Sequence, residues 1–252
     1  MSTPQAYILD EEVIAEVEDY METLVTEDDE PVDNFFSDYQ RRLLVDALRC
    51  SWQPVDENGL PRNYLAATDV AVFYGLRQPP IVPDMFLCLD REAPEEFWRK
   101  RHRSYFTWEY GKAPEVAVEI VSNTEGHETG SKLRDYAGVG IPYYVVFDPG
   151  RFLDDEVLRI FKRDAGRYIR YHDRYFPDIG LGVTLWEGSY EDVKPTLWLR
   201  WCNEQGNPLL TGVERANAEM ERANAEAERA DLLAARLREL GIDPDQIQPR
   251  KT

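Results

Sequence analysis

The segment Val116-Ala117-Val118-Glu119-Ile120-Val121 is a continuous apolar run that one glutamate interrupts. Runs of this kind are typical of strands that other elements cover on both faces. An ionised carboxylate buried there without a partner costs several kcal/mol, so Glu119 must be paired, protonated or bound to a cation. The segment therefore predicts a central strand of a sheet and marks Glu119 as a candidate for chemistry.

A second carboxylate precedes another apolar run. Asp84 follows Pro83 and stands directly before Met85–Leu89, which also has the composition of a buried strand. Two strand carboxylates aimed at one point form a hard oxygen site of the type that Mg²⁺ prefers, with water and substrate completing the coordination. The alternative for Asp84 and Glu119 is a structural ion pair with a cationic side chain.

The rest of the chain predicts an α/β domain in which strands outnumber helices. A helix is expected to begin at Ser37, with Ser37 as N-cap and Gln40 at the capping-box position. Asp164-Ala165-Gly166 is expected to form the turn of a β-hairpin. The expected strands are Thr68–Tyr74, Met85–Leu89, Val116–Val121, Tyr143–Phe147, Val157–Phe161 and Arg167–Tyr171.

A short helix is expected over Glu128–Ala137, ending at Gly138. Lys132 and Tyr136 stand four residues apart and therefore share one face of that helix. A lysine beside a carboxylate pair can orient an attacking water or stabilise the charge of a phosphodiester transition state. A solvated surface lysine is the alternative interpretation.

The C-terminal region contains an internal heptad repeat. The sequence Glu-Arg-Ala-Asn-Ala-Glu at 214–219 recurs at 221–226. The spacing predicts a helix over 213–241, which forms either a weak coiled-coil homodimer or a single helix packed on its own domain. The apolar seam would consist of Val213, Ala216, Met220, Ala223, Ala227, Ala230, Ala234 and Leu237.

Composition favours one globular unit with extensions, because 252 residues with 43% apolar content can bury one sizeable core. The net charge of −19 opposes nucleic-acid binding, but residues 1–38 alone contain 13 acidic residues and no Lys or Arg. A basic cluster, Arg99, Lys100, Arg101 and Arg103, precedes the aromatic residues Tyr105, Phe106, Trp108 and Tyr110 and is a candidate nucleic-acid contact. A solvated helix end is the alternative interpretation of the cluster.

Several other kinds of site find no support. The chain has three widely spaced cysteines, three histidines without metal-ligand spacing, and neither a nucleophile elbow nor a phosphate-binding glycine loop. A membrane-spanning apolar run and a secretory leader are also missing from the sequence, so we expect no membrane partner and a cytoplasmic protein.

One ordered combination of residues resembles a known family. Pro83-Asp84, then 119–122, then Glu128 with Lys132 and Tyr136, then 140–149, together look like the Uma-two family of restriction endonucleases. That family is common in cyanobacteria and belongs to the PD-(D/E)XK nuclease superfamily. The resemblance extends roughly from Ser37 to Leu185.

The resemblance implies a restriction-endonuclease-like core, a mixed sheet flanked by helices, that acts on DNA. It implies a site for Mg²⁺ or Mn²⁺ formed by Asp84, Glu119 and the backbone carbonyl of Ile120. It also implies hydrolysis of DNA phosphodiester bonds by metal-activated water, with Lys132 as the third catalytic residue.

The sequence departs from the pattern of the superfamily at three positions. The superfamily's lysine usually stands two residues after the glutamate, where this chain has Val121, so Lys132 on the next helix would replace it. Glu128 stands where Asp is usual, and Gln40 is the nearest counterpart of a glutamate that the first helix often offers. Gln40, Glu128 and Tyr136 are therefore second-tier site candidates.

The expected organisation is an acidic extension over 1–36, an endonuclease-like domain over 37–205, the helix over 213–241 and a tail over 242–252. The alternative function is a nuclease-derived fold that does not cut. Such a protein would serve as a binding or scaffold module that associates through its C-terminal helix.

Overall fold

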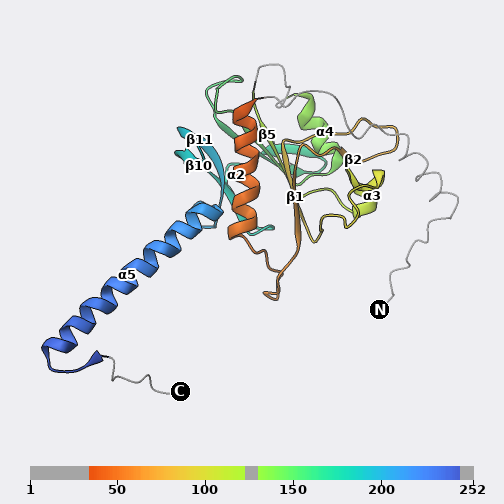
Figure 1. Ribbon diagram of the computed structural model, residues 1–252. Coiled ribbons are helices and arrows are strands. Elements are labelled where there is room, and N and C mark those ends of the chain that lie inside the picture. Colours follow the sequence, from red (N-terminus) through yellow and green to blue (C-terminus); the bar gives the residue numbers. More distant parts are fainter. Residues whose placement is uncertain (1–33, 123–129, 245–252) are drawn as a thin grey trace.

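The computed structural model describes residues 34–122 and 130–244 (Figure 1). Its centre is a six-stranded sheet with the strand order β1-β3-β5-β6-β7-β8. β5 and β6 pair in parallel, and every other neighbouring pair in this sheet is antiparallel. The predicted mixed α/β class is confirmed. The strands are β1 (Tyr64–Thr68), β3 (Met85–Leu89), β5 (Val116–Ile120), β6 (Tyr143–Phe147), β7 (Leu158–Asp164) and β8 (Arg167–Arg170).

The three central strands carry the hydrophobic core on both faces. Every residue of β3, β5 and β6 is buried. Helix α2 (Phe35–Ser51) packs Leu44 and Leu48 against one face, and helix α4 (Ser131–Val139) packs Tyr136 against the other. Apolar residues on both faces of these strands are therefore what the two helical layers require.

Two smaller sheets complete the domain. A three-stranded antiparallel sheet, β11-β10-β9, packs beside α2. It adds Trp201 and Leu199 to the hydrophobic core that also contains Leu44 and Leu48. A parallel pair, β2 and β4, lies near the short helix α3 (Thr107–Tyr110) and the 3-10 turn η1 (Lys100–His102). The strands are β2 (Val72–Phe73), β4 (Tyr105–Phe106), β9 (Tyr175–Phe176), β10 (Leu181–Tyr190) and β11 (Val193–Cys202).

The predicted start of the first helix is corrected. Asn34, not Ser37, is the N-cap, because the Asn34 side chain accepts a hydrogen bond from the backbone N–H of Ser37 at 2.9 Å. The helix therefore begins at Phe35, inside the segment predicted to be an extension. Ser37 lies in the first turn and is fully buried.

Gln40 does not act as a capping-box residue. Its side-chain amide is buried and hydrogen-bonds both backbone groups of Leu199 in β11, with Nε2 donating to the carbonyl at 2.8 Å and Oε1 accepting from N–H at 2.9 Å. Because Leu199 lies in the middle of a strand, these two bonds fix α2 to the smaller sheet.

The predicted strand Thr68–Tyr74 is wrong. Asp69 adopts a left-handed conformation, with φ of 53°, which ends β1 at Thr68. The chain then turns into β2, which pairs with β4 in a different sheet. The turn places the Asp69 side chain beside α2, where Arg41 donates to it.

The predicted hairpin is present with slightly different strand bounds, and the helix that was predicted to end at Gly138 extends one residue further. The hairpin at Ala165 and Gly166 is confirmed, and both residues have the positive φ of a two-residue turn. Gly138 does not end α4, which extends to Val139. Gly140, with φ of 97°, is its C-cap.

The hairpin of β10 and β11 was not predicted. Only one end of each strand is fully buried, so polar residues are interspersed along them, and Pro195 lies within β11. These features weaken the alternation that identifies a strand in sequence.

The C-terminal helix α5 (Gly212–Glu239) is confirmed, and it extends away from the domain (Figure 1). Its first turn is held firmly. Thr211 and Glu214 form a capping box, and Arg200 binds the Glu214 carboxylate with two nitrogens. The rest of the helix has no buried residue, and none of the described helices is long and apolar enough to span a membrane.

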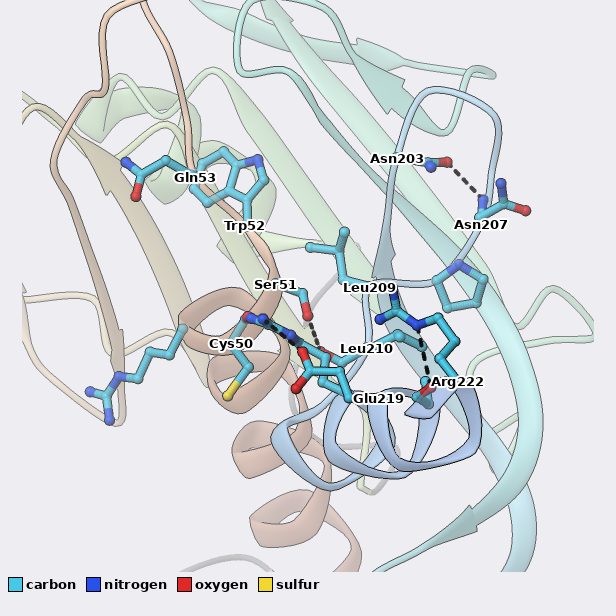
Figure 2. Close-up of a pocket in the computed structure, with 14 residues that line it drawn as sticks. Cys50, Ser51, Trp52, Gln53, Asn203, Asn207, Leu209, Leu210, Glu219 and Arg222 are labelled. Atoms are coloured by element: carbon cyan, nitrogen blue, oxygen red, sulfur yellow. Dashed lines mark hydrogen bonds and ion pairs between the residues drawn. The ribbon is translucent and has the colours of Figure 1, made fainter. Parts of the chain in front are cut away.

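A hollow of about 620 Å³ lies where the end of α2 meets the start of α5 (Figure 2). Its wall includes Ser51, whose hydroxyl donates to the Leu210 carbonyl at 2.6 Å, and Arg215, which donates to the Cys50 carbonyl. These contacts set the direction of α5. No predicted site residue lines this hollow.

We predict that Gln40→Ala lowers the free energy of unfolding by roughly 2–4 kcal/mol, because it leaves two buried backbone groups of Leu199 without partners. Denaturant unfolding measures the change. The matched control is Gln53→Ala, whose exposed side chain donates one bond to the Arg62 carbonyl at 3.3 Å and whose loss should cost less than about 0.5 kcal/mol. Equal losses in the two variants would contradict the role given to Gln40.

Candidate active site

Two acidic side chains meet at one end of the central sheet. β3 and β5 are antiparallel with Met85 opposite Val118, so one step further along this register Asp84 is opposite Glu119. Opposed residues of antiparallel strands direct their side chains to the same face of the sheet. Both residues are buried, with Asp84 7% and Glu119 3% exposed.

Helix α4 supplies both partners of Glu119. Lys132 Nζ lies 2.9 Å from Glu119 Oε2, and the Tyr136 hydroxyl donates to Glu119 Oε1. The spacing of four residues places these two side chains one above the other on the helix. The helix therefore brings a cation and a hydroxyl donor to the same carboxylate.

Asp84 is held from two different elements. Its Oδ2 accepts from the backbone N–H of Ile120 at 2.7 Å, and its Oδ1 accepts from Arg41 Nη1 at 2.9 Å. Arg41 comes from α2, which covers the opposite face of the sheet, and reaches Asp84 where β3 begins. The same Nη1 also lies 2.8 Å from Asp69 Oδ1.

Burial dominates the electrostatics of both acids. Desolvation raises the pKa of Glu119 to about 8, with Lys132 opposing the rise and the nearby Asp84 adding to it. Desolvation also raises the pKa of Asp84, against the Ile120 N–H, Arg41 and Lys132. Removal of Tyr136 from water raises the pKa of its hydroxyl well above the usual value, so this group stays protonated as a donor.

The donor set fits a hard divalent cation. Each of the four carboxylate oxygens accepts one protein hydrogen bond, which leaves a second lone pair on each. The Ile120 N–H points toward Asp84 while the Val121 N–H bonds β6, so the Ile120 carbonyl is also directed to the Asp84 side of β5. The described residues contain no cluster of three or more His, Cys, Asp or Glu side chains suited to a metal. Two carboxylates with a carbonyl are the kind of set that Mg²⁺ accepts when water and substrate complete its shell.

The structure places the second-tier candidates differently. Tyr136 lies in the cluster, whereas Gln40 faces β11 and does not reach the carboxylates. Glu128 lies outside the described residues.

Sequence reasoning missed Arg41 and Asp69. The signal for Arg41 was present, because it stands three and seven residues before Leu44 and Leu48, on the stripe that α2 buries. An arginine on a buried stripe needs an acidic partner. No sequence pattern indicated Asp69, because its position beside Arg41 depends on the turn that ends β1.

The basic cluster lies on η1 and its flanks. Arg101 pairs with Glu109 at 3.3 Å and Arg99 with Glu96. Of the aromatic residues that follow the cluster, Tyr105 and Phe106 are buried core residues of β4 and therefore cannot stack on nucleic acid. Next to the cluster, a hollow of about 380 Å³ is lined by Thr68, Val70, His102 and Arg103, among others.

Comparison with known proteins identifies a family. A family model, Uma2, described as "Putative restriction endonuclease", matches residues 28–178. No curated protein matches the sequence. The matched range contains the carboxylate pair, both of its cations and the basic cluster.

We predict that metal-free protein loses stability relative to Glu119→Gln as pH rises. The pKa of Glu119 is raised from 4.5 to about 8 in the folded chain, so folding favours the protonated form. Its contribution is full below about pH 4.5 and is lost as pH approaches 8, by up to about 4 kcal/mol. Urea unfolding in the presence of a chelator, repeated across this range, measures the difference between the two proteins. A difference that is independent of pH would rule out a proton on Glu119.

Proposed function

The chain belongs to the Uma2 family, and from this premise we propose that it hydrolyses phosphodiester bonds of DNA with the help of Mg²⁺ or Mn²⁺. The observation that carries the proposal is the buried pair of Asp84 and Glu119 on adjoining strands. Each acid is in contact with a cationic side chain from a different helix. The pair and its two cations lie together at one end of the sheet, where β3 begins and β5 ends.

Asp84, Glu119 and the Ile120 carbonyl would hold the cation. When bound, a divalent cation supplies positive charge that activates water and offsets the charge of the phosphate. Lys132 would contact the substrate in addition to Glu119. Its side chain is about one-third exposed, so its ammonium can turn to a phosphate oxygen or a water. Tyr136 keeps Glu119 Oε1 in place.

DNA would lie across the open end of this site. Thr68 and Val70, the two chain neighbours of Asp69, line a hollow that continues to Arg103 at the end of the basic cluster. Arg99, Lys100, Arg101 and Arg103 would supply phosphate contacts along this hollow. These basic side chains are clustered in one part of a chain whose net charge is −19, so phosphate contacts would be confined to that part.

We predict that Glu119→Gln and Lys132→Met each reduce DNA cleavage about 100-fold or more, because each removes a charge placed at the reacting phosphate. Plasmid nicking and cleavage of labelled single-stranded DNA, with Mg²⁺ or Mn²⁺, measure the rates. Glu204→Gln and Lys194→Met are controls of the same chemistry at exposed positions. If wild type and all variants show the same background nicking, the chain is not a nuclease and the scaffold alternative remains.

A specific observation favours an association role for α5, with or without cleavage. The helix is anchored through its first turn, has no buried residue, and exposes Met220 of the heptad seam beyond that turn. In proteins, most of the stability of a helix comes from packing of an apolar face rather than from helix propensity. We propose that the heptad seam of α5 pairs with α5 of a second copy of this chain.

We predict that Ala223→Glu abolishes a concentration-dependent dimer, because it places a charge on the seam. Ala225→Glu, two residues further on and outside the seam, should leave the dimer intact. Sedimentation equilibrium over a range of concentrations measures both. A full-length chain that stays monomeric at every concentration would refute the pairing.

A further inference from the structure

Arg41 occupies an unusual place for an arginine. Its side chain is only 5% exposed, and it lies on the buried stripe of α2 with Leu44 and Leu48. An arginine cannot shed its proton in a protein, so its charge must be balanced by partners inside the fold. Asp84 and Asp69 are those partners, at 2.9 and 2.8 Å.

Only one nitrogen of Arg41 makes these contacts. Nη1 donates to both carboxylates, while Nε and Nη2 donate to no residue within 34–122 and 130–244. The guanidinium therefore keeps three N–H groups, one on Nε and two on Nη2, that have no acceptor among the described residues.

Asp69 fixes the direction of this guanidinium. Its backbone has φ of 53°, in the turn between β1 and β2, and its side chain is 51% exposed. Asp69 and Asp84 thus hold Nη1 from the solvent side and from the buried side.

The charges of the site leave room for an anion. Among residues 34–122 and 130–244, three carboxylates, Asp69, Asp84 and Glu119, face two cations, Arg41 and Lys132, so these five groups carry one net negative charge when all are ionised. A divalent cation changes this sum to one positive charge. A phosphodiester, which carries one negative charge, then makes the site neutral.

We propose that Arg41 binds a non-bridging phosphate oxygen of the substrate through Nε and Nη2, and that Asp69 is a positioning residue for Arg41. The substrate identity rests on the proposed function. A counter-ion for Asp84 would need only a positive charge, and lysine would serve equally well. Phosphate binding needs the planar fork of arginine, because Nη1 is already engaged and only the other nitrogens can reach the ligand.

The test compares Arg41→Lys with Arg42→Lys. Arg42 is the adjacent residue on the same helix, pairs with Asp38 and Glu191 at 2.8 Å, and is exposed. Fluorescence anisotropy with a labelled DNA duplex in Ca²⁺ gives DNA affinity, calorimetry with Mn²⁺ gives metal affinity, and single-turnover assays in Mg²⁺ give the cleavage rate. Thermal unfolding checks that each variant is folded.

We expect Arg41→Lys to weaken DNA binding or slow single-turnover cleavage by about 10- to 100-fold, the value of a charge-assisted hydrogen bond. Mn²⁺ affinity should stay within about threefold, because the charge beside Asp84 is kept. Arg42→Lys should leave all three quantities unchanged. Asp69→Ala should weaken DNA binding in the wild-type background and have no further effect in Arg41→Lys, which a purely structural Asp69 would not produce.

The outcomes separate this inference from the nuclease proposal. If wild type binds the duplex without cutting it, and Arg41→Lys weakens that binding at unchanged Mn²⁺ affinity, Arg41 binds phosphate although hydrolysis fails. If Arg41→Lys matches wild type in every measurement, Arg41 is only a counter-ion and the inference is overturned. Parallel losses of Mn²⁺ and DNA affinity, or a wild type that binds no duplex, overturn it as well.

Discussion

The burial of two acids at the centre of a sheet is the constraint on which the rest of this structure depends. A buried carboxylate that loses its partner destabilises a fold by about 3–5 kcal/mol. Asp84 and Glu119 are tolerated because Arg41 comes from one helical layer and Lys132 from the other. The site is therefore complete only when both layers are packed, and the fold and the site depend on the same contacts.

Helix α2 connects this site to the smaller sheet through two adjacent residues. Gln40 is bonded to the middle of β11, and Arg41 is bonded to Asp84. The next turn adds Leu44 to the core between the two sheets. Because β11 also carries Arg200, which binds Glu214 at the base of α5, a single continuous set of contacts extends from the acids to the start of the projecting helix. The orientation of α5 is thus fixed by the same helix that supplies a cation to the site.

The sequence predicted the parts of this arrangement that depend on local pattern. The buried strands at Met85–Leu89 and Tyr143–Phe147 have the predicted bounds, and the hairpin turn at Gly166 is where its chemistry required it. Lys132 lies beside Glu119 because a helix places it there after a strand. The identity of the residues that neutralise Asp84 could not be predicted, since Arg41 is 43 residues away in the chain and Asp69 depends on a left-handed turn. Gln40 was misjudged for the same reason, because its partner Leu199 is 159 residues away.

Under the proposed function, an acidic chain must bind phosphate in spite of its own negative charge. With a net charge of −19, the molecule repels nucleic acid at long distance, yet the Debye length at physiological ionic strength is about 8 Å, so the charges of residues 1–38 are screened beyond their immediate surroundings. What decides binding is the set of donors within contact distance. A guanidinium that folding has already desolvated and oriented costs little further reorganisation when a phosphate arrives. Under the proposed function, burying Arg41 between two carboxylates is therefore the means by which a strongly acidic protein keeps a local phosphate site.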